Sequence, residues 1–407
     1  MKKIFLIVLC MFLLSACGND KSVAGNKEKN NKESLETNKG NLKENNIQEE
    51  GTKKENGIIT HDISFKASKK YRDSIALKAV ENGVYYFSYS TDSEWCYAKY
   101  CDGKMSDIYS LDNKYDIFYE DIINGNLVIG CFLNNKVTIM KVSMQGKEEI
   151  ITEFNMPTLP IIAYTGNSLV WCEKELEDNL NKEKLMVYYF DTGKKEDTGI
   201  KCEYKKKGNY YTGDVVMALG GWQDGFCYTV TKFNNEYMYD DLSGETEIYY
   251  YSFKDKKSEK LTDYQYKPAY IGGSEEAVIV SDYILQGHED TGKVLYSTEK
   301  GYETKLLDGV NAAENIYNSY SFKNNNYIAA NDEYFWIFNT KGQTCQKYKF
   351  NHVYEGDFGK EGWKPSDHIT SRIIKSGDKC YYSVYNNPLI EIYQINIENT
   401  ESKKAWK

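Results

Sequence analysis

The sequence is poor in the residues and motifs on which most catalytic sites depend. Its 407 residues include only four histidines, His61, His288, His352 and His368, which are far apart. There is no Gly-x-Ser-x-Gly nucleophile elbow, no His-Glu-x-x-His motif, no phosphate-binding glycine-rich loop, no EF-hand loop and no Cys-x-x-Cys pair. We therefore predict no catalytic residue, no metal site and no cofactor, and we expect a binding function rather than catalysis.

The sequence also lacks an apolar run long enough to cross a membrane as a helix. The N-terminal run, residues 4–14, would form a helix of roughly 17 Å, about half of a bilayer core of about 30 Å. Its basic start and its short length are typical of a secretory signal peptide. The stretch LSAC (14–17) resembles the lipobox of bacterial lipoproteins. That resemblance implies cleavage before Cys17 and a diacylglyceryl group on its thiol; the alternative is an ordinary signal peptide that contains a cysteine.

Two acyl chains give stable attachment to a membrane, whereas one gives only marginal binding. We therefore expect a lipid-anchored protein on the extracytoplasmic face of the cell membrane, with residues 1–16 as its signal peptide. Residues 17–56 are mostly Lys, Asn, Glu, Gly, Ser and Thr with balanced charge, which predicts a disordered tether. Such a tether has a typical end-to-end distance of roughly 35 Å. The folded domain should occupy residues 57–407.

The charge and the aromatic content of this domain narrow its class. The signal segment carries two lysines and the tether is neutral, so the net charge of −9 becomes −11 for the remainder. A negative body is a poor partner for nucleic acid or for anionic lipid headgroups. Aromatic residues make up 14% of the chain, including 37 tyrosines, which favours strands over helices. No segment shows a sustained helical period with caps.

A turn rich in Gly, Asn and Asp leads into a Tyr/Val/Ile-rich strand, and this pattern occurs seven times. Six of these turns contain a glycine and one has Asn325 instead, at intervals of 41 to 59 residues. The instances are NGVYYFSYS (82–90), NGNLVIGCF (124–132), TGNSLVWCE (165–173), QDGFCYTVT (223–231), GGSEEAVIVS (272–281), NNNYIAAN (324–331) and SGDKCYYSV (376–384). Each is followed by a second polar turn, from CDGK (101–104) to IENT (397–400), and preceded by an apolar run. Every repeat therefore predicts four strands and two hairpin turns.

Four-stranded repeats of this length predict an all-β fold, a seven-bladed β-propeller. Stacked blades cover both faces of their strands, which explains apolar runs such as LVIGCF that lack strict alternation. IITHDISF (58–65) is a candidate for an extra strand that closes the ring by pairing in the last blade. A large β-sandwich pair is the alternative, but it does not explain the common period. The pattern resembles the uncharacterised propeller lipoproteins of Gram-positive bacteria, a resemblance that implies a fold and not a function.

The eight cysteines of the domain have two possible roles. Cys131, Cys172, Cys227 and Cys380 fall in the second strand of a repeat, where a buried thiol acts as a small apolar side chain. An exported chain also permits disulfides, and Cys96 and Cys101 could pair across the end of a hairpin. The irregular spacing favours free thiols in the core.

The long loops indicate where a ligand would bind. In a propeller, the loop between the second and third strands of a blade lies on the same face as the connection to the next blade. Three consecutive loops of the first kind are long and acidic, residues 173–184, 233–247 and 286–292, and the connection 351–367 lies on the same face. We expect a carboxylate-rich rim there. Its candidate ligand-binding residues are Tyr237, Tyr239, Asp240, Asp241, Asp357 and Trp363. Trp222 should lie on the opposite face and serve packing.

Aromatic rings beside carboxylates suit sugars, basic peptides or cations, although the same loops could simply be solvated. We predict a non-catalytic binding or scaffold module for an envelope protein or a wall glycan. The alternative is a glycoside hydrolase or lyase that uses two of Asp240, Asp241, Glu355 and Asp357, since such enzymes need two carboxylates about 5 to 10 Å apart. A third hypothesis is a purely structural assembly factor for an envelope complex.

Overall fold

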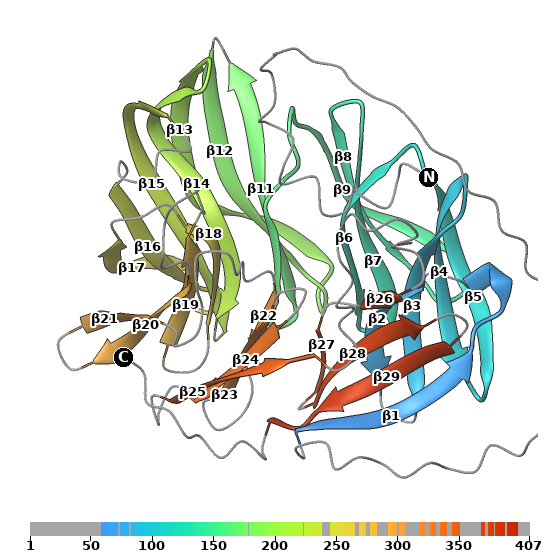
Figure 1. Cartoon of the computed structure of the whole chain (residues 1–407). Coiled ribbons are helices and arrows are strands. Elements are labelled where there is room, and N and C mark those ends of the chain that lie inside the picture. The colour runs from blue at the N-terminus through green and yellow to red at the C-terminus, as the bar shows by residue number, and fades with distance from the viewer. Residues whose placement is uncertain are drawn as a thin grey trace, which may run out of the picture. The chain divides into compact units, whose positions relative to one another are not determined.

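A computed structural model of the chain describes an all-β domain (Figure 1). The chain divides into two compact units, Met1–Thr52 and Lys53–Lys407, and every described residue belongs to the second. No helix of the described residues is long and apolar enough to cross a membrane. The predicted signal peptide, Cys17 and the tether lie outside the described residues. The described residues are 58–71, 74–80, 83–177, 179–222, 224–237, 245–264, 268–273, 277–282, 292–298, 301–306, 318–321, 326–330, 334–339, 344–350, 368–370, 373–377, 379–386 and 389–397.

The described strands form six antiparallel sheets, and one of these, with eight strands, comprises two four-stranded units. The domain therefore has seven units, the blades. Blades 1 and 2 consist of β2 (Ile75–Val80), β3 (Val84–Ser90), β4 (Glu94–Cys101) and β5 (Lys104–Asp112), then β6 (Asp116–Ile123), β7 (Asn126–Leu133), β8 (Lys136–Val142) and β9 (Glu148–Asn155). Blades 3 and 4 consist of β10 (Ile162–Thr165), β11 (Ser168–Glu177), β12 (Leu180–Tyr189) and β13 (Lys194–Lys207), then β14 (Tyr210–Trp222), β15 (Gly225–Tyr237), β16 (Glu245–Ser252) and β17 (Lys257–Tyr264). Blades 5 and 6 consist of β18 (Pro268–Gly273), β19 (Ala277–Asp282), β20 (Gly292–Thr298) and β21 (Gly301–Leu306), then β22 (Asn318–Ser321), β23 (Asn326–Ala330), β24 (Tyr334–Asn339) and β25 (Thr344–Lys349).

Blade 7 joins the two ends of the domain. It consists of β26 (His368–Thr370), β27 (Ile374–Ser376), β28 (Lys379–Asn386), β29 (Leu389–Ile395) and β1 (Ile59–Lys66), with η1 (Lys69–Tyr71), a short 3-10 helix, leading on to blade 1. β1 pairs antiparallel with β29, from Ile59 opposite Ile395 to Lys66 opposite Leu389. The predicted closing strand is therefore confirmed, and it is the outer strand of the last blade. The strand predicted after the turn at 397–400 lies outside the described residues, and the predicted inner run 369–374 is divided between β26 and β27.

Local turn chemistry sets many of these hairpins. Cys101 pairs with Lys104 and Ile123 pairs with Asn126, so Asp102-Gly103 and Asn124-Gly125 are two-residue turns. Their φ angles are 51° and 75° in the first turn and 49° and 71° in the second. Positive φ at both central positions is the geometry that Asp-Gly and Asn-Gly favour, because it matches the twist of the flanking strands. Gly225 differs: a Cβ there would lie 1.9 Å from the Tyr251 carbonyl oxygen, so close strand approach requires the glycine.

The core consists of apolar layers between successive blades. Within β7, Leu127 and Ile129 pack in a cluster with blade 1, whereas Val128 packs in a cluster with blade 3. Further clusters join blades 7 and 1, blades 3 and 4, blades 4 and 5, and blades 6 and 7. β18 of blade 5 contacts β22 of blade 6. The seven blades therefore form a closed ring, a β-propeller, as predicted from the repeats.

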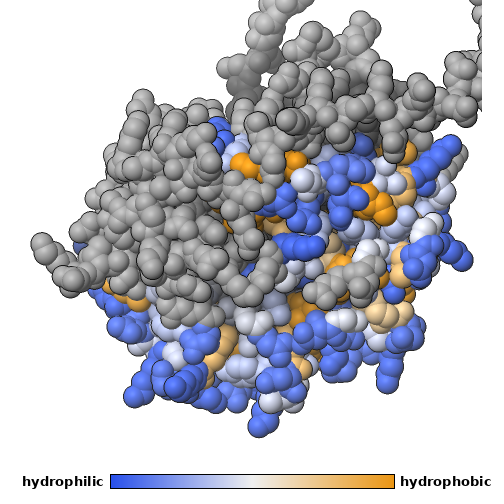
Figure 2. All heavy atoms as spheres, turned by 90° about the horizontal axis from the view of Figure 1, so that it is seen from below, coloured by the Kyte–Doolittle hydropathy of each residue, from blue (hydrophilic) through white to orange (hydrophobic). Residues whose placement is uncertain are grey.

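The surface agrees with this arrangement of the core. On the face drawn in Figure 2, the coloured hydrophobic residues are separate spots among hydrophilic ones.

The structure also tests the predictions for the buried cysteines and for Trp222. Cys131, Cys172, Cys227 and Cys380 are each buried, on β7, β11, β15 and β28 respectively, which confirms the second-strand prediction. Trp222 is buried against Tyr250, with ring centroids 5.2 Å apart, which confirms a packing role.

We expect Ile129→Ala to destabilise the propeller far more than Ile150→Ala. Ile129 is fully buried between blades 1 and 2, whereas Ile150 on the outer strand β9 is 56% exposed. The first substitution should lower the free energy of unfolding by about 2–5 kcal/mol, since it leaves a cavity. The second should change it by no more than about 0.5 kcal/mol. Urea unfolding of both variants measures this, and equal effects would contradict the interblade core.

Candidate functional site

Of the predicted ligand-binding residues, Tyr237 is the one that the structure describes. Tyr237 is the last residue of β15, and its backbone pairs with that of Tyr210 at the start of β14. The predicted lipidation site, Cys17, lies outside the described residues. So do the remaining predicted ligand-binding residues and Glu355; these ligand-binding residues are Tyr239, Asp240, Asp241, Asp357 and Trp363. The structure thus brings Tyr237 next to a segment, the β13–β14 hairpin, that sequence reasoning did not single out.

Blades 3 and 4 are joined into one eight-stranded sheet by unusually long strands. β11 and β12 have 10 residues each and β13, β14 and β15 have 13 or 14, against 6 to 9 in blades 1 and 2 (Figure 1). The ends of β13 and β14 pair from Tyr204 opposite Gly213 to Lys207 opposite Tyr210. Four to six extra residues lengthen a strand by roughly 13–20 Å. We call these strand ends, residues 173–184, 201–214 and 231–237, the strand platform.

The prediction of a long loop at residues 173–184 is wrong. These residues continue β11 and β12 as a hairpin, paired without interruption as far as Glu177 opposite Leu180, and Asn179 in the turn has φ 67°. The sequence does carry a signal for this hairpin. Glutamates at every second position before the turn face lysines at every second position after it, which is the period of a strand.

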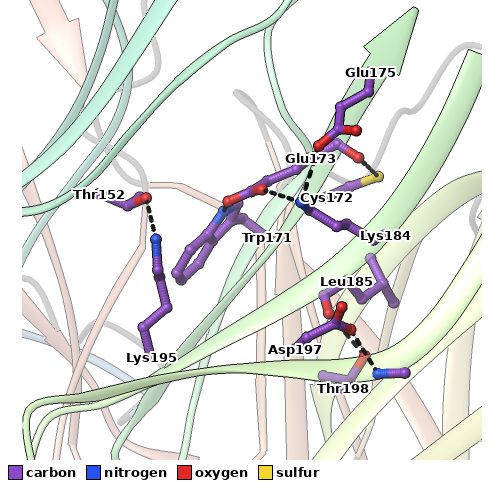
Figure 3. A network of polar contacts seen from close by, with 11 residues as sticks. Thr152, Trp171, Cys172, Glu173, Glu175, Lys184, Leu185, Lys195, Asp197 and Thr198 are labelled. Atoms are coloured by element: carbon purple, nitrogen blue, oxygen red, sulfur yellow. Dashed lines mark hydrogen bonds and ion pairs between the residues drawn. The ribbon is translucent and has the colours of Figure 1, made fainter. Parts of the chain in front are cut away.

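Cross-strand ion pairs neutralise the carboxylates of this hairpin. The Lys184 ammonium lies 3.2 Å from a Glu173 oxygen and 3.0 Å from a Glu175 oxygen (Figure 3), and Lys182 pairs with Glu177. Glu173 also accepts a hydrogen bond of 3.1 Å from the indole N–H of Trp171. Glu173 is buried, whereas Glu175 and Glu177 are exposed, so water screens their pairs and these contribute little to stability. In this hairpin, therefore, the carboxylates of Glu173, Glu175 and Glu177 are paired charges.

One ion pair of the platform is buried and ties three strands together. Glu183 on β12 is 1% exposed; one carboxylate oxygen lies 2.8 Å from the Lys174 ammonium and the other accepts a 2.7 Å hydrogen bond from the Val216 N–H. Burial alone would lower the pKa of Lys174, but the adjacent Glu183 carboxylate outweighs it and the pKa is raised. Lys174 therefore stays charged and holds β11 and β12 against β14.

A small apolar core of its own supports the platform. Tyr204, Tyr211, Val215, Met217 and Phe233 pack together, with 5.5 Å between the ring centroids of Tyr211 and those of both Tyr204 and Phe233. This core explains why long strands persist beyond the blade interface.

The thiols and other metal-binding side chains offer no second site in the described part of the chain. Seven cysteines there are free, and six of them are buried. Burial raises the pKa of Cys202 to about 12 and that of Cys131 to about 11, so these thiols stay protonated. Cys96 and Cys101 lie on the same strand, β4, so they do not pair across a hairpin end. Among the described residues no three metal-binding side chains form a group.

Some solved structures are similar to this domain at low sequence identity. No protein-family profile matches the sequence, and no curated protein sequence matches it. The solved structures similar to it include the β-propeller domain of the Trilobed protease from Pyrococcus furiosus, at 11% identity and TM-score 0.45, covering 81% of this chain and 98% of that one. An uncharacterized protein from Listeria monocytogenes is similar at 9% identity and TM-score 0.44, covering 83% and 98%. A prolyl endopeptidase matches at 10% identity and TM-score 0.49, over 83% of this chain and half the length of that one.

We expect Glu183→Gln to lower the free energy of unfolding by about 3–5 kcal/mol, because it leaves the Lys174 charge buried without a carboxylate. Glu175→Gln removes a carboxylate that is paired at the surface, with 66% of its side chain exposed, and should cost less than about 1 kcal/mol. Urea unfolding at neutral pH compares the two variants. Similar losses for both would show that the buried pair does not support the platform.

Acid should weaken the base of the platform through Glu247. Hydrogen bonds from Lys260 and Tyr249, with a further contribution from Lys232, lower the pKa of Glu247 from 4.5 to about 2. A lowered folded-state pKa means that this carboxylate stabilises the fold above its unfolded pKa and loses that contribution as the pH falls toward 2. Between about pH 5 and about pH 2, the wild type should lose about 1–3 kcal/mol more than Glu247→Gln. Parallel pH profiles of the two proteins would contradict this.

Proposed function

We propose that this chain is a non-catalytic binding or scaffold module, held at the extracytoplasmic face of the cell membrane by a diacylglyceryl group on Cys17. Its partner is an envelope protein or a wall glycan. The observation that carries the proposal is the strand platform. It is a supported surface on the side of the propeller where the long connections were expected, and Tyr237, one of the predicted ligand-binding residues, belongs to it.

The construction of the platform supports binding. Its strands are held by the Lys174–Glu183 pair and by the apolar cluster around Tyr211, so its exposed side chains sit on a fixed backbone. A preorganised surface binds with less loss of conformational freedom than a flexible loop. The glutamates of its β11 strand are engaged by lysines, which gives them a structural role. The hydrolase alternative rests on residues outside those described and stays a prediction.

The location is proposed from the LSAC stretch and the tether. A tether of roughly 35 Å keeps the propeller near the membrane while leaving it free to turn. Because the anchor already holds the propeller at the membrane, contact with a partner in the same envelope is effectively intramolecular. A weak contact with the platform is then enough to hold that partner.

Photocrosslinking on intact cells tests this function. A photoreactive residue at Tyr210, which is 52% exposed on the platform, should capture a specific partner. The matched control carries the same photoreactive residue at Lys104. This exposed position is at the start of β5, the outer strand of blade 1, and so at the end of the strands opposite to the platform. We expect crosslinks from position 210 that position 104 does not give, identified by mass spectrometry. Cys17→Ala should remove labelling with radioactive palmitate and reduce the yield.

Equal capture from both positions, or none from either, would contradict a partner-binding platform. Palmitate labelling that Cys17→Ala leaves unchanged would contradict the anchor. The two results are independent, because the first concerns the platform and the second the N-terminus.

A further inference from the structure

The platform carries a set of lysines that its ion pairs leave free. Lys174, Lys182, Lys184 and Lys232 pair with glutamates on neighbouring strands. By contrast, Lys201, Lys205 and Lys207 on β13 are exposed, and none of the described carboxylates forms an ion pair with them. Three unpaired lysines on one strand are notable in a chain whose net charge is −9. Nothing in the packing of the platform requires them.

These lysines share one face of the sheet with a tyrosine. Side chains alternate along β13, and Cys202 and Tyr204 point to the buried side, so Lys201, Lys205 and Lys207 point to the other. Lys207 pairs with Tyr210, which places the half-exposed Tyr210 ring on that same face. We call Lys201, Lys205, Lys207 and Tyr210 the basic row. Its first and last lysines are six residue positions apart along the strand, a distance of roughly 20 Å.

Two further charged residues of β13, Glu203 and Lys206, lie next to the lysines of the row. Glu203 lies on the same face, between Lys201 and Lys205 and opposite Lys182, so one carboxylate stands among the lysines of the row. Lys206 points to the other face, where its ammonium lies 5.4 Å from the centre of the Tyr211 ring. The row therefore carries three lysines and one glutamate along one strand, a net positive charge, and ends at an aromatic ring.

We propose that the basic row binds a linear phosphodiester-linked wall polymer, with phosphates on the lysines and a sugar or polyol unit against Tyr210. This proposal rests on the proposed binding function and names the ligand class of that platform. A line of charge fits a chain of regularly spaced phosphates. A membrane surface is a plane, and a hairpin that enters it needs an apolar tip. The β13–β14 turn is Gly208-Asn209, which offers no such tip.

The test measures binding of a linear poly(glycerol phosphate) to the full-length lipidated chain in detergent micelles. The row variant is Lys201→Gln/Lys205→Gln/Lys207→Gln. Its matched control is Lys104→Gln/Lys147→Gln/Lys194→Gln, which removes the same charge from three exposed lysines at the opposite ends of the outer strands and, among the described residues, breaks no ion pair. Three phosphate contacts predict that affinity falls roughly 15–20-fold between 50 and 200 mM salt.

We expect the row variant to bind at least tenfold more weakly than the wild type, and the control to bind within twofold of it. Tyr210→Ala should weaken binding severalfold, whereas Tyr210→Phe should retain most of it, since the ring supplies the contact. Unchanged binding by the row variant, or an equal loss in the control, would overturn the proposal. Phosphatidylglycerol vesicles that compete as well as the polymer at equal phosphate would assign the row to headgroups and also overturn it.

These outcomes are distinguishable from failure of the proposed function. Crosslinking of a protein partner from position 210, together with no polymer binding, would keep the binding module and reject the polymer. Polymer binding through the row, with capture of the polymer rather than a protein from position 210, would support both.

Discussion

The structure depends on one constraint: a propeller blade cannot bury both faces of its strands by itself. In β7, consecutive residues are buried on alternate sides, with Ile129 packed toward blade 1 and Val128 toward blade 3. Each blade therefore needs two neighbours, and only a closed ring gives every blade two. The pairing of β1 with β29 meets this need, because the N-terminal strand completes the sheet that the C-terminal strands begin. Separating the last blade from the first would expose the cluster around Ile390 and Phe87.

The same constraint explains how the strand platform is built. A strand that continues beyond its blade loses the apolar neighbours that the ring provides, and it must be stabilised by other means. Here the Tyr211 cluster supplies a small second core, and the Lys174–Glu183 pair supplies a buried link to the Val216 N–H. A buried ion pair adds little net stability, yet it strongly disfavours arrangements in which either charge lacks its partner. The pair thus favours the packing of β11 and β12 in which Glu183 reaches the Val216 N–H of β14.

The sequence could predict the features that depend on neighbouring residues. The turns at Asp102-Gly103 and Asn124-Gly125 follow from two residues each, and the repeats follow from counting such turns. The hairpin at residues 173–184 was missed because its strands are charged, so a polar stretch was interpreted as a loop. The burial of Glu183 could not be predicted at all, since it depends on Val216, 33 residues later. The free lysines of β13 were missed for another reason: a net charge summed over the whole domain hides a local excess of the opposite sign.

That local excess makes physical sense because the rest of the body is negative. A polyanion approaching a surface of like charge is repelled from most orientations, so the few positive positions determine where and how it can bind. On a uniformly basic protein three lysines would add affinity, but they would not fix how the polyanion lies on the surface. Here they favour one orientation of the bound chain, along the line from Lys201 to Tyr210. The ion pairs of β11 and β12 contribute to this selectivity: they hold Lys182 and Lys184 on glutamates, whereas Lys201, Lys205 and Lys207 of β13 pair with none of the described carboxylates. Removing Glu175 or Glu177 would release further lysine charge beside the row, so the glutamates limit the width of the positive strip to a single strand.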